Sequence, residues 1–252
     1  MNQERRKNIV ELLEKQGTVT NAELMERFDI SIETVRRDLA FLEKEGFLER
    51  VYGGAVRKKF MNTEPDYANR EKENFAEKQA IAKETEKLIH IKDTVFFDVG
   101  TTVLQLARFL DKNKEISAFT NSLRTAIVLS EKGMSVIVPG GNLRDGEFSI
   151  SGSLAENNFS HFNVETAIIG VGGITEDGIT DFIPEEAALR QKVIKNANKV
   201  IAVADYSKFG VRAMCNVCKP DEIDVLVTDS KAPKSLLLKL EKMGVQIIVA
   251  NV

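Results

Sequence analysis

From residue 94 onwards, short apolar runs rich in β-branched and aromatic residues alternate with segments of helical periodicity. Strands that are buried on both faces read as such continuous apolar runs. Strands separated by helices are typical of a parallel sheet with helices packed on its faces. The alternation therefore predicts an α/β domain with a mostly parallel sheet covered on both sides. The runs are TVFFD, ISAFT, SVIVPGG, ETAIIGVGG, KVIAVAD, VLVTD and VQIIVA.

The composition is that of an ordinary globular protein, with 43% apolar and 29% charged residues among 252. This excludes a disordered or fibrous chain, which buries too little apolar surface to offset chain entropy. The longest stretch without a charged residue, Gly133 to Leu143, has eleven residues, whereas a membrane span needs roughly 20. The N-terminus lacks the apolar core of a signal peptide, and two cysteines fit a reduced compartment. We therefore expect a cytoplasmic protein that does not associate with membranes.

The N-terminal part predicts three short helices. Apolar residues at helical spacing within residues 3–16 indicate the first. The capping-box pattern Thr20-Asn21-Ala22-Glu23 begins a second, short helix. Asp29-Ile30-Ser31 predicts a tight turn whose serine caps a third helix, running to about Glu45 and stopped by Gly46. A short helix, a three-residue turn and a longer helix have the proportions of a helix-turn-helix.

The third predicted helix has an apolar back and a basic front. On a helical wheel Arg37 points nearly opposite the apolar residues, with Thr34 beside it and Arg36 on a flank. Arginine can bond guanine in a bidentate way, and threonine can reach a base or a thymine methyl group. Residues 1–60 hold 12 Lys and Arg against 11 Asp and Glu, so DNA binding requires this sorting of basic side chains onto one face. The apolar residues on the back of this third helix are Ile32, Val35, Leu39 and Leu42.

The segment FLERVYGGAV after this helix predicts a β-hairpin wing. Its apolar and aromatic residues, up to Tyr52, favour β-structure, and Gly53-Gly54 favours a tight turn. Arg50 and Arg57 would then lie near DNA phosphates. The alternative is a small three-helix bundle that binds no nucleic acid.

In that alternative, Arg36 and Arg37 form a solvated face and pair with Glu33 and Asp38. However, residues 20–56 closely resemble the DeoR-type winged helix-turn-helix of bacterial repressors, including the motifs T-V-R-R-D-L and Y-G-G-A. The resemblance implies contacts with double-stranded operator DNA. The family's usual wing histidine is Tyr52 here. The expected DNA-binding residues are Thr20, Ser31, Thr34, Arg36, Arg37, Arg50, Tyr52, Gly53 and Gly54.

Residues 58–74 are charged, contain Pro65 and lack apolar periodicity. They predict a linker between a DNA-binding domain at residues 1–57 and an effector domain at residues 75–252, which begins with an amphipathic helix. We expect this linker to be the place where the DNA-binding head is repositioned, since it has no core of its own.

Small, hydroxyl and glycine residues cluster where several predicted strands end. Ligands of parallel sheets bind beyond the carboxyl ends of the strands. Gly100, Thr101 and Thr102 there offer backbone N–H groups, two hydroxyls and a helix N-terminus, which are the parts of a phosphate cradle. Lys208 could add a positive charge for the same ligand. Each motif alone is more often an ordinary turn or helix cap, but their joint placement at one edge favours a ligand site.

The order D-x-G-T-T, T-N-S, G-G, G-x-G-G-I and D-x-S-K-F-G resembles the DeoR-type C-terminal sensor domain, from about Glu77 to Asp229. That domain is similar in fold to ribose-5-phosphate isomerase. The resemblance implies a phosphorylated sugar effector, and it also matches Glu186 and Arg190 on the helix after the G-I-T-D loop. The expected effector-binding residues are Asp98, Gly100, Thr101, Thr102, Thr120, Asn121, Ser122, Gly140, Gly141, Gly172, Gly173, Asp205 and Lys208.

Two alternatives assign other chemistry. An isomerase needs an acidic cluster, which is D-G-A-D-E in the enzymes, but the stretch GVGGITEDG lacks it and leaves Asp98 and Asp205 as acids. A thiol-based redox regulator would use the C-x-x-C of residues 215–218, yet no pattern here indicates a lowered thiol pKa. The pair also lacks two ligands of a structural zinc site, and His90 and His161 have no partner motif. We expect no catalytic residue, no metal and no cofactor.

The sequence therefore predicts a DNA-binding transcriptional repressor of a sugar-metabolism operon that a phosphorylated sugar releases from DNA. A single winged head offers a small DNA interface, and repressors usually pair two heads on two half-sites. We expect a homodimer or higher homo-oligomer, assembled through the α/β domain.

Overall fold

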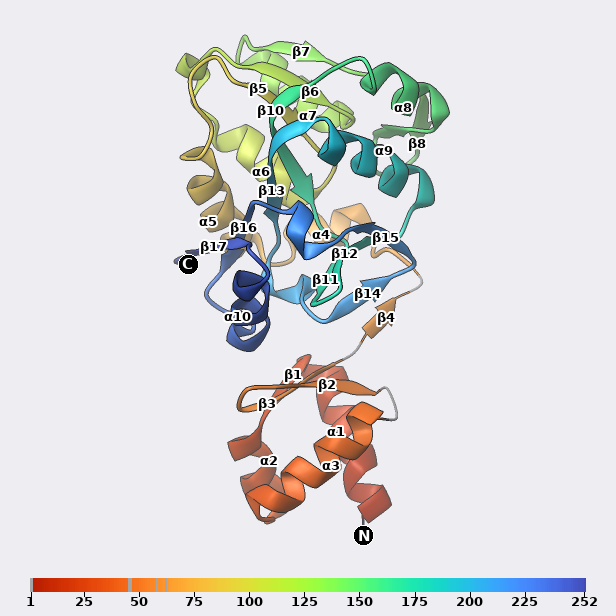
Figure 1. Ribbon diagram of the computed structural model, residues 1–252, viewed down its shortest axis with the longest axis vertical. Helices are drawn as coiled ribbons and strands as arrows, with labels where there is room; N and C mark the ends of the chain where they lie inside the picture. Colours follow the sequence, from red (N-terminus) through yellow and green to blue (C-terminus); the bar gives the residue numbers. More distant parts are fainter. Residues whose placement is uncertain (1, 45–46, 58, 62) are drawn as a thin grey trace.

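The computed structural model describes residues 2–44, 47–57, 59–61 and 63–252. They form a small N-terminal winged domain and a larger α/β body (Figure 1). Among the helices of these described residues, none combines the length and the apolar character that a bilayer crossing requires.

The structure of the winged domain confirms the three predicted helices and the predicted hairpin. Thr20 caps the second helix, because its hydroxyl accepts a hydrogen bond from the Glu23 amide at 3.1 Å. The hairpin turn falls at Tyr52 and Gly53, so that Gly54 begins a strand instead of completing the turn. Residues 45–46, where the third helix was expected to end, lie outside the described residues. The elements are α1 (Asn2–Gln16), β1 (Thr18–Thr20), α2 (Asn21–Phe28), α3 (Ile32–Lys44), β2 (Leu48–Val51) and β3 (Gly54–Arg57), with sheet order β1-β3-β2.

The α/β body is built on a seven-stranded sheet in which every pairing is parallel, as the sequence predicts. Its order is β17-β16-β13-β10-β5-β6-β7, so β13, β10 and β5 lie at the centre. The strands are β5 (Thr94–Phe97), β6 (Ser117–Thr120), β7 (Ser135–Ile137), β10 (Val164–Gly170), β13 (Ala197–Val203), β16 (Val225–Asp229) and β17 (Gln246–Ala250).

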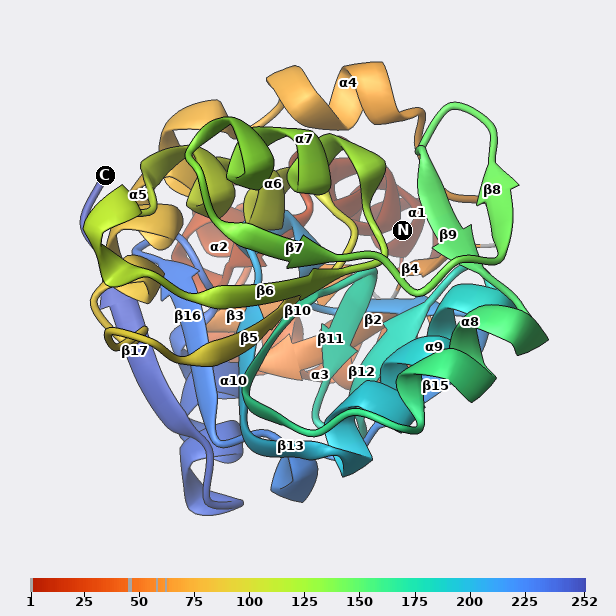
Figure 2. The ribbon, with the colours of Figure 1, turned by 90° about the horizontal axis from the view of Figure 1, so that it is seen from above.

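Helices cover both faces of this sheet (Figure 2). Strand β5 shows why: Val95 and Phe97 enter the core under one set of helices, whereas Phe96 enters the core under the other. This alternation confirms the predicted two-sided burial. The first set is α5 (Phe75–Glu86), α6 (Thr101–Phe109) and α7 (Leu123–Glu131), and the second is α8 (Ser153–Phe159), α9 (Pro184–Lys195) and α10 (Lys234–Lys242).

Smaller β-elements surround one end of the sheet, and the sequence predicts none of them separately. The run ETAIIGVGG, expected as one strand, divides between β10 and β11. The elements are the hairpin β8 (Asn142–Arg144) and β9 (Ser149–Ser151), the antiparallel sheet of β11 (Gly173–Thr175), β12 (Gly178–Asp181) and β15 (Cys215–Cys218), and β14 (Val211–Ala213).

The described part of the expected linker packs on the α/β body. Strand β4 (Lys59–Met61) pairs in parallel with β14, and helix α4 (Tyr67–Lys72) follows. The Tyr67 side chain is buried, and the Arg124 guanidinium lies 4.2 Å from its ring centre. We call residues 63–72 the strap. The domain boundaries at residues 57 and 74 stay a prediction, but the strap is folded rather than a free tether.

Candidate DNA interface and ligand pocket

The exposed front of α3 carries the two arginines of the expected DNA interface. Arg36 and Arg37 are exposed, and neither guanidinium has an ion-pair partner in the described part of the chain. Asp38, a partner in the bundle-only alternative, instead accepts hydrogen bonds from Arg5 and Arg6 of α1 at 2.6 and 2.8 Å. Its side chain is buried. This leaves the α3 arginines available for an external anion.

A groove of about 440 Å³ separates α3 from the wing and is lined by both, including Arg36 and Arg50. Arg50 pairs with Glu43 at 2.7 Å, but both side chains are substantially exposed. Such a pair contributes only about 0–1 kcal/mol, so a DNA phosphate can compete for it. Tyr52 at the tip of the wing is 97% exposed. The Arg57 side chain lies outside the described residues.

The other residues expected at this interface shape it locally. Thr20 caps α2, and the Ser31 hydroxyl accepts a hydrogen bond from the Thr34 amide at 3.4 Å. Gly53 has φ +88°, a conformation that favours glycine. A Cβ on Gly54 would lie 2.0 Å from the carbonyl oxygen of Val19, so the wing can approach β1 only with glycine here.

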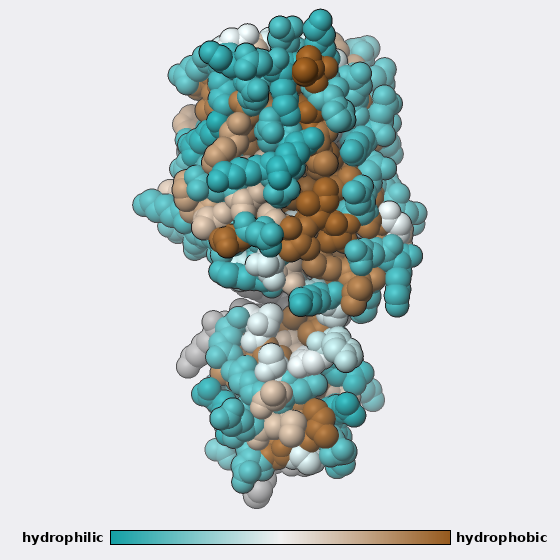
Figure 3. Space-filling model, turned by 90° about the vertical axis from the view of Figure 1, so that its left-hand side faces the viewer, coloured by the Kyte–Doolittle hydropathy of each residue, from teal (hydrophilic) through white to brown (hydrophobic). Residues whose placement is uncertain are grey.

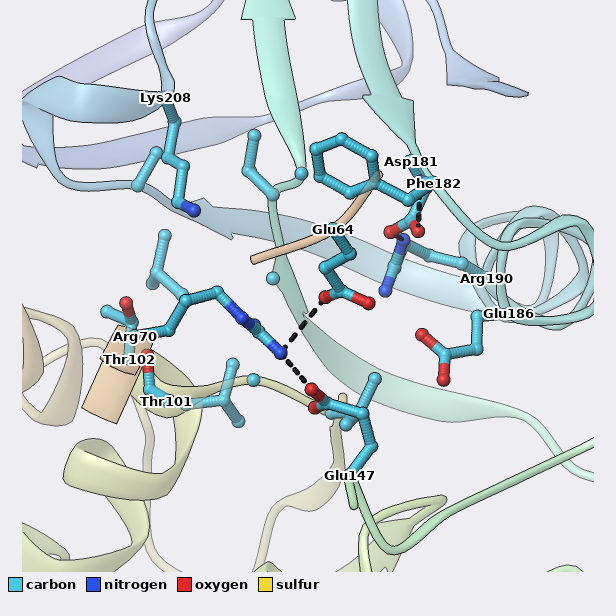
Figure 4. Close-up of a pocket in the computed structure, with 18 residues that line it drawn as sticks. Glu64, Arg70, Thr101, Thr102, Glu147, Asp181, Phe182, Glu186, Arg190 and Lys208 are labelled. Carbon is cyan, nitrogen blue, oxygen red and sulfur yellow. Dashed lines mark hydrogen bonds and ion pairs between the residues drawn. The ribbon is translucent and has the colours of Figure 1, made fainter. Parts of the chain in front are cut away.

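A second candidate site lies at the carboxyl ends of the three central strands β5, β10 and β13. Thr101 and Thr102 reach it from the end of β5 and Lys208 from that of β13 (Figure 4). Gly100, after β5, and Gly172, after β10, also line it. The structure thus brings together predicted residues that lie more than a hundred positions apart. The cavity volume is about 40 Å³.

One side of this pocket has the features of an anion cradle. Helix α6 begins at Thr101, and its N-cap Gly100 has no side chain to accept hydrogen bonds from the first turn. The Lys208 ammonium group points into the cavity (Figure 4) and has no hydrogen-bond or ion-pair partner among the described residues. Burial lowers the pKa of Lys208, and the negative charge of nearby Asp205 opposes this shift only in part. Helix N-termini and unpaired cations both favour a bound anion.

The floor of the pocket is a buried charge network around Arg190, which is only 3% exposed. Arg190 donates to both Asp98 and Asp181. Asp98 also accepts the Val99 and Gly170 amides, at 2.8 and 3.0 Å. Asp98, expected as an effector ligand, therefore lies beneath the pocket with its oxygens already engaged, and it does not line the cavity.

Glu186, the other helix residue suggested by the family pattern, does line the pocket. Its carboxylate accepts the Ser149 hydroxyl at 2.5 Å and Arg144 at 3.1 Å. Burial nevertheless raises the pKa of Glu186 to about 7. Both protonation states of Glu186 are therefore populated near neutral pH.

The roof comes from two segments that the sequence does not single out. The strap contributes Glu64 and Arg70, and the loop between β8 and β9 contributes Glu147. Arg70 contacts the Glu64 carboxylate at 3.0 Å and also pairs with Glu147 (Figure 4). Arg144 holds Glu64 from the other side at 2.8 Å. No local pattern could have found these residues, since the partners are about 80 positions apart.

The predicted Thr120-Asn121-Ser122 loop does not line the pocket. It follows β6, one strand further out than β5. Its backbone instead anchors the β8–β9 hairpin, because the carbonyl of Asn121 accepts the Ile150 amide at 2.7 Å. The Ser122 hydroxyl caps α7 by accepting the Thr125 amide at 3.3 Å.

The remaining predicted effector residues also lie outside the pocket lining. Asp205 accepts hydrogen bonds from Asn74 at 2.9 Å and from the Ser207 hydroxyl at 2.5 Å, and so ties the start of α5 to the loop that carries Lys208. The predicted effector residues meant here, which do not line the pocket, are Gly140, Gly141, Gly173 and Asp205.

The two cysteines of the C-x-x-C motif lie on β15. Cys218 is buried in the core of the α/β body, and Cys215 is partly buried against the same core. Burial raises the pKa of the Cys218 thiol to about 12. A redox-active cysteine needs the opposite shift, so this motif does not have the features of a thiol switch.

Comparison with known proteins matches both domains. Residues 5–60 match the family model of the DeoR-like helix-turn-helix domain, and residues 73–230 match that of the DeoR C-terminal sensor domain. The chain is 34% identical to the HTH-type transcriptional regulator GolR of Listeria innocua, over 98% of each chain. It is 33% identical to the glycerol-3-phosphate regulon repressor of Escherichia coli K12, over 97% of each.

Among solved structures, ribose 5-phosphate isomerase A from Methanocaldococcus jannaschii overlaps with a TM-score of 0.41 at 17% identity. The overlap covers 54% of this chain and 55% of that chain.

Proposed function

Because this chain belongs to the DeoR family of helix-turn-helix transcriptional regulators, we propose that it represses an operon of sugar metabolism and leaves its operator when a phosphorylated sugar binds. The observation that carries the effector proposal is the unpaired Lys208 ammonium group, which points into a pocket beside the N-terminus of α6. The Escherichia coli relative is named for a glycerol-3-phosphate regulon, which agrees with a phosphorylated effector.

The winged domain supplies the DNA-binding half of this proposal. Arg36 and Arg37 on α3 would enter the major groove, because both are exposed and have no ion-pair partner among the described residues, with Arg37 nearly opposite the apolar residues of α3 and Arg36 on its flank. Arg50 and Tyr52 on the wing would lie against the sugar-phosphate backbone of the DNA. Contacts with bases in the major groove specify sequence, whereas contacts with the DNA backbone set position and affinity.

We also propose that the pocket performs no catalysis. In the stretch GVGGITEDG the two acids belong to surface ion pairs: Glu176 with Lys239 at 2.6 Å, and Asp177 with Arg212 at 3.6 Å. This supports a binding site rather than an isomerase site. Turnover of ribose 5-phosphate or a hexose phosphate by the purified protein would contradict this part of the proposal.

The functional unit is proposed to be a cytoplasmic homo-oligomer that places two winged domains on two half-sites. The face of the α/β body in Figure 3 carries a larger continuous apolar area than the winged domain does, which favours the body as the assembly unit. Sedimentation at micromolar concentration tests this, and a strict monomer that binds DNA through one head would contradict it.

A thermal-shift panel of phosphorylated sugars and their unphosphorylated counterparts tests the effector proposal. A ligand at 100 times its dissociation constant adds about 2.7 kcal/mol of stability. We expect stabilisation by phosphorylated members only, and a smaller effect in Lys208→Met. The effector proposal fails if no phosphorylated sugar stabilises the protein, or if Lys208→Met responds as the wild type does.

A further inference from the structure

The roof of the pocket contains a carboxylate where the proposed ligand would carry its negative charge. Glu64 lies between two guanidinium groups, those of Arg70 and Arg144, at 3.0 and 2.8 Å. Figure 4 shows Arg70 on the same side of the cavity as Lys208 and Thr101, with Glu64 facing it. An anion at the α6 N-terminus would therefore meet Arg70 while Glu64 still holds it.

The pocket is too small for a sugar phosphate while the strap is in place. A cavity of about 40 Å³ has room for only a few water molecules. Ligand pockets are typically several hundred Å³. The floor is built from buried network residues on sheet strands and α9, so the roof is the part that can yield.

The net charge of the pocket lining becomes less negative when Glu64 leaves. Three cations line the pocket, namely Arg70, Arg190 and Lys208, against four carboxylates. Glu64 is the carboxylate contributed by the strap, whereas Asp181 and Glu186 belong to β12 and α9. Displacement of Glu64 removes one carboxylate from the lining, which makes the pocket more favourable for an entering anion.

The strap is also the segment that leads to the winged domain. Glu64 comes three residues after β4, and β4 pairs with β14 directly after the DNA-binding domain. Within the strap, Arg70 also donates to the carbonyl of Pro65 at 2.8 Å, so Glu64, Pro65 and Arg70 form one connected unit. A change at Glu64 therefore acts on the chain that positions the head.

We propose that Glu64 is a built-in competitor of the effector: the anionic group of the ligand takes over Arg70, displaces Glu64 and frees the strap. Arg70 then becomes an effector-binding residue contributed by the chain between the two domains. This inference rests on the proposed function of the pocket. It adds the step by which ligand binding reaches the winged domain, since a ligand shifts an arrangement only by binding its two forms unequally.

The test uses the full-length protein with inorganic phosphate as the probe, because phosphate is the group that all phosphorylated sugars share. Calorimetric titration measures affinity, and hydrogen exchange measures amide protection within residues 63–72. In the wild type, phosphate should speed exchange in the strap. Glu64→Gln should bind phosphate about tenfold more tightly, as expected for the loss of one like-charge repulsion of about 1.4 kcal/mol.

Glu71→Gln is the matched control. It removes the same charge from the same strap, but Glu71 pairs with Arg108 at 3.1 Å on the surface, away from the pocket lining. Its phosphate affinity should stay within about twofold of the wild type. Equal effects of the two variants would overturn the inference, because they would reflect general loosening of the strap.

Two further outcomes separate this inference from the proposed function. If Lys208→Met weakens phosphate binding but strap exchange does not respond to phosphate, the competitor role of Glu64 is wrong and the effector site stands. If neither the wild type nor Glu64→Gln binds phosphate or a phosphorylated sugar, the effector site and this inference both fail.

Discussion

Replacing Arg190 by methionine removes a buried cation that bridges Asp98 and Asp181 in the pocket floor. Breaking a buried pair by deleting one partner typically costs about 3–5 kcal/mol, because it leaves an uncompensated charge. Two carboxylates are stranded here, but each keeps two backbone N–H donors. We therefore expect the free energy of unfolding to fall by about 3 kcal/mol at neutral pH, near the lower end of that range.

Urea unfolding of the α/β body measures this loss, and its pH dependence identifies the cause. In Arg190→Met the folded-state pKa of both carboxyl groups should lie above its unfolded value. Folding of the variant then takes up protons, so its stability should increase as pH falls from about 7 to about 5, and the gap to the wild type should narrow. A pH-independent gap would contradict the stranded-charge explanation.

The matched control is Arg212→Met, which removes an arginine from a surface pair with Asp177 at 3.6 Å. Both side chains are well exposed there, so the cost should stay below about 1 kcal/mol. If Arg190→Met were no more costly than this control, the network would not support the pocket floor as described.

Three further perturbations test separate parts of the account. Arg37→Ala should cost roughly 1–3 kcal/mol on an operator duplex selected from a random library and relax specificity at one base pair, whereas Arg50→Ala should weaken all duplexes alike and lower the salt dependence; anisotropy titrations that match the wild type for both would remove α3 and the wing from the interface. Glu186→Gln should flatten the pH profile of phosphate affinity, because the pKa of Glu186 is about 7 and its ionisation above that pH adds a negative charge to the pocket; an unaltered calorimetric profile would show that Glu186 does not contribute. Gly54→Ala should disrupt the β1–β3 pairing, because its Cβ would lie 2.0 Å from the Val19 carbonyl, and an unchanged amide spectrum of the winged domain would refute this.

The sheet was predictable because its signal is local. Each of its strands is a short apolar run, and alternation along β5 sends Val95 and Phe97 to one face and Phe96 to the other. The G-T-T motif was predictable for the same reason, since a strand end, a glycine and a helix start are adjacent in the chain. Lys208 followed from its place after β13.

The order of the strands is not local, and it decides which strand ends meet. β13, β10 and β5 are neighbours, so their ends form the pocket. β6 is one position further out, so its Thr120-Asn121-Ser122 end holds the β8–β9 hairpin instead. Equal motifs at the ends of different strands therefore acquire different roles, which spacing along the chain does not reveal.

The roof was missed because its residues look like a solvated linker. Glu64 and Arg70 lie in a charged segment without apolar periodicity, and such segments usually stay exposed. Their partners Arg144, at the end of β8, and Glu147, in the loop between β8 and β9, are about 80 residues away. Only the folded chain shows that these charges compensate one another above the pocket.

The most direct test of the central claim is the affinity of the full-length protein for its selected operator duplex, measured by anisotropy with and without a phosphorylated sugar that stabilises it. Coupling between two sites is typically about 1–3 kcal/mol, which corresponds to a 5- to 150-fold change in affinity. We predict that the ligand weakens operator binding within this range, and that Lys208→Met reduces the response. An operator affinity that the bound ligand leaves unchanged would contradict the account.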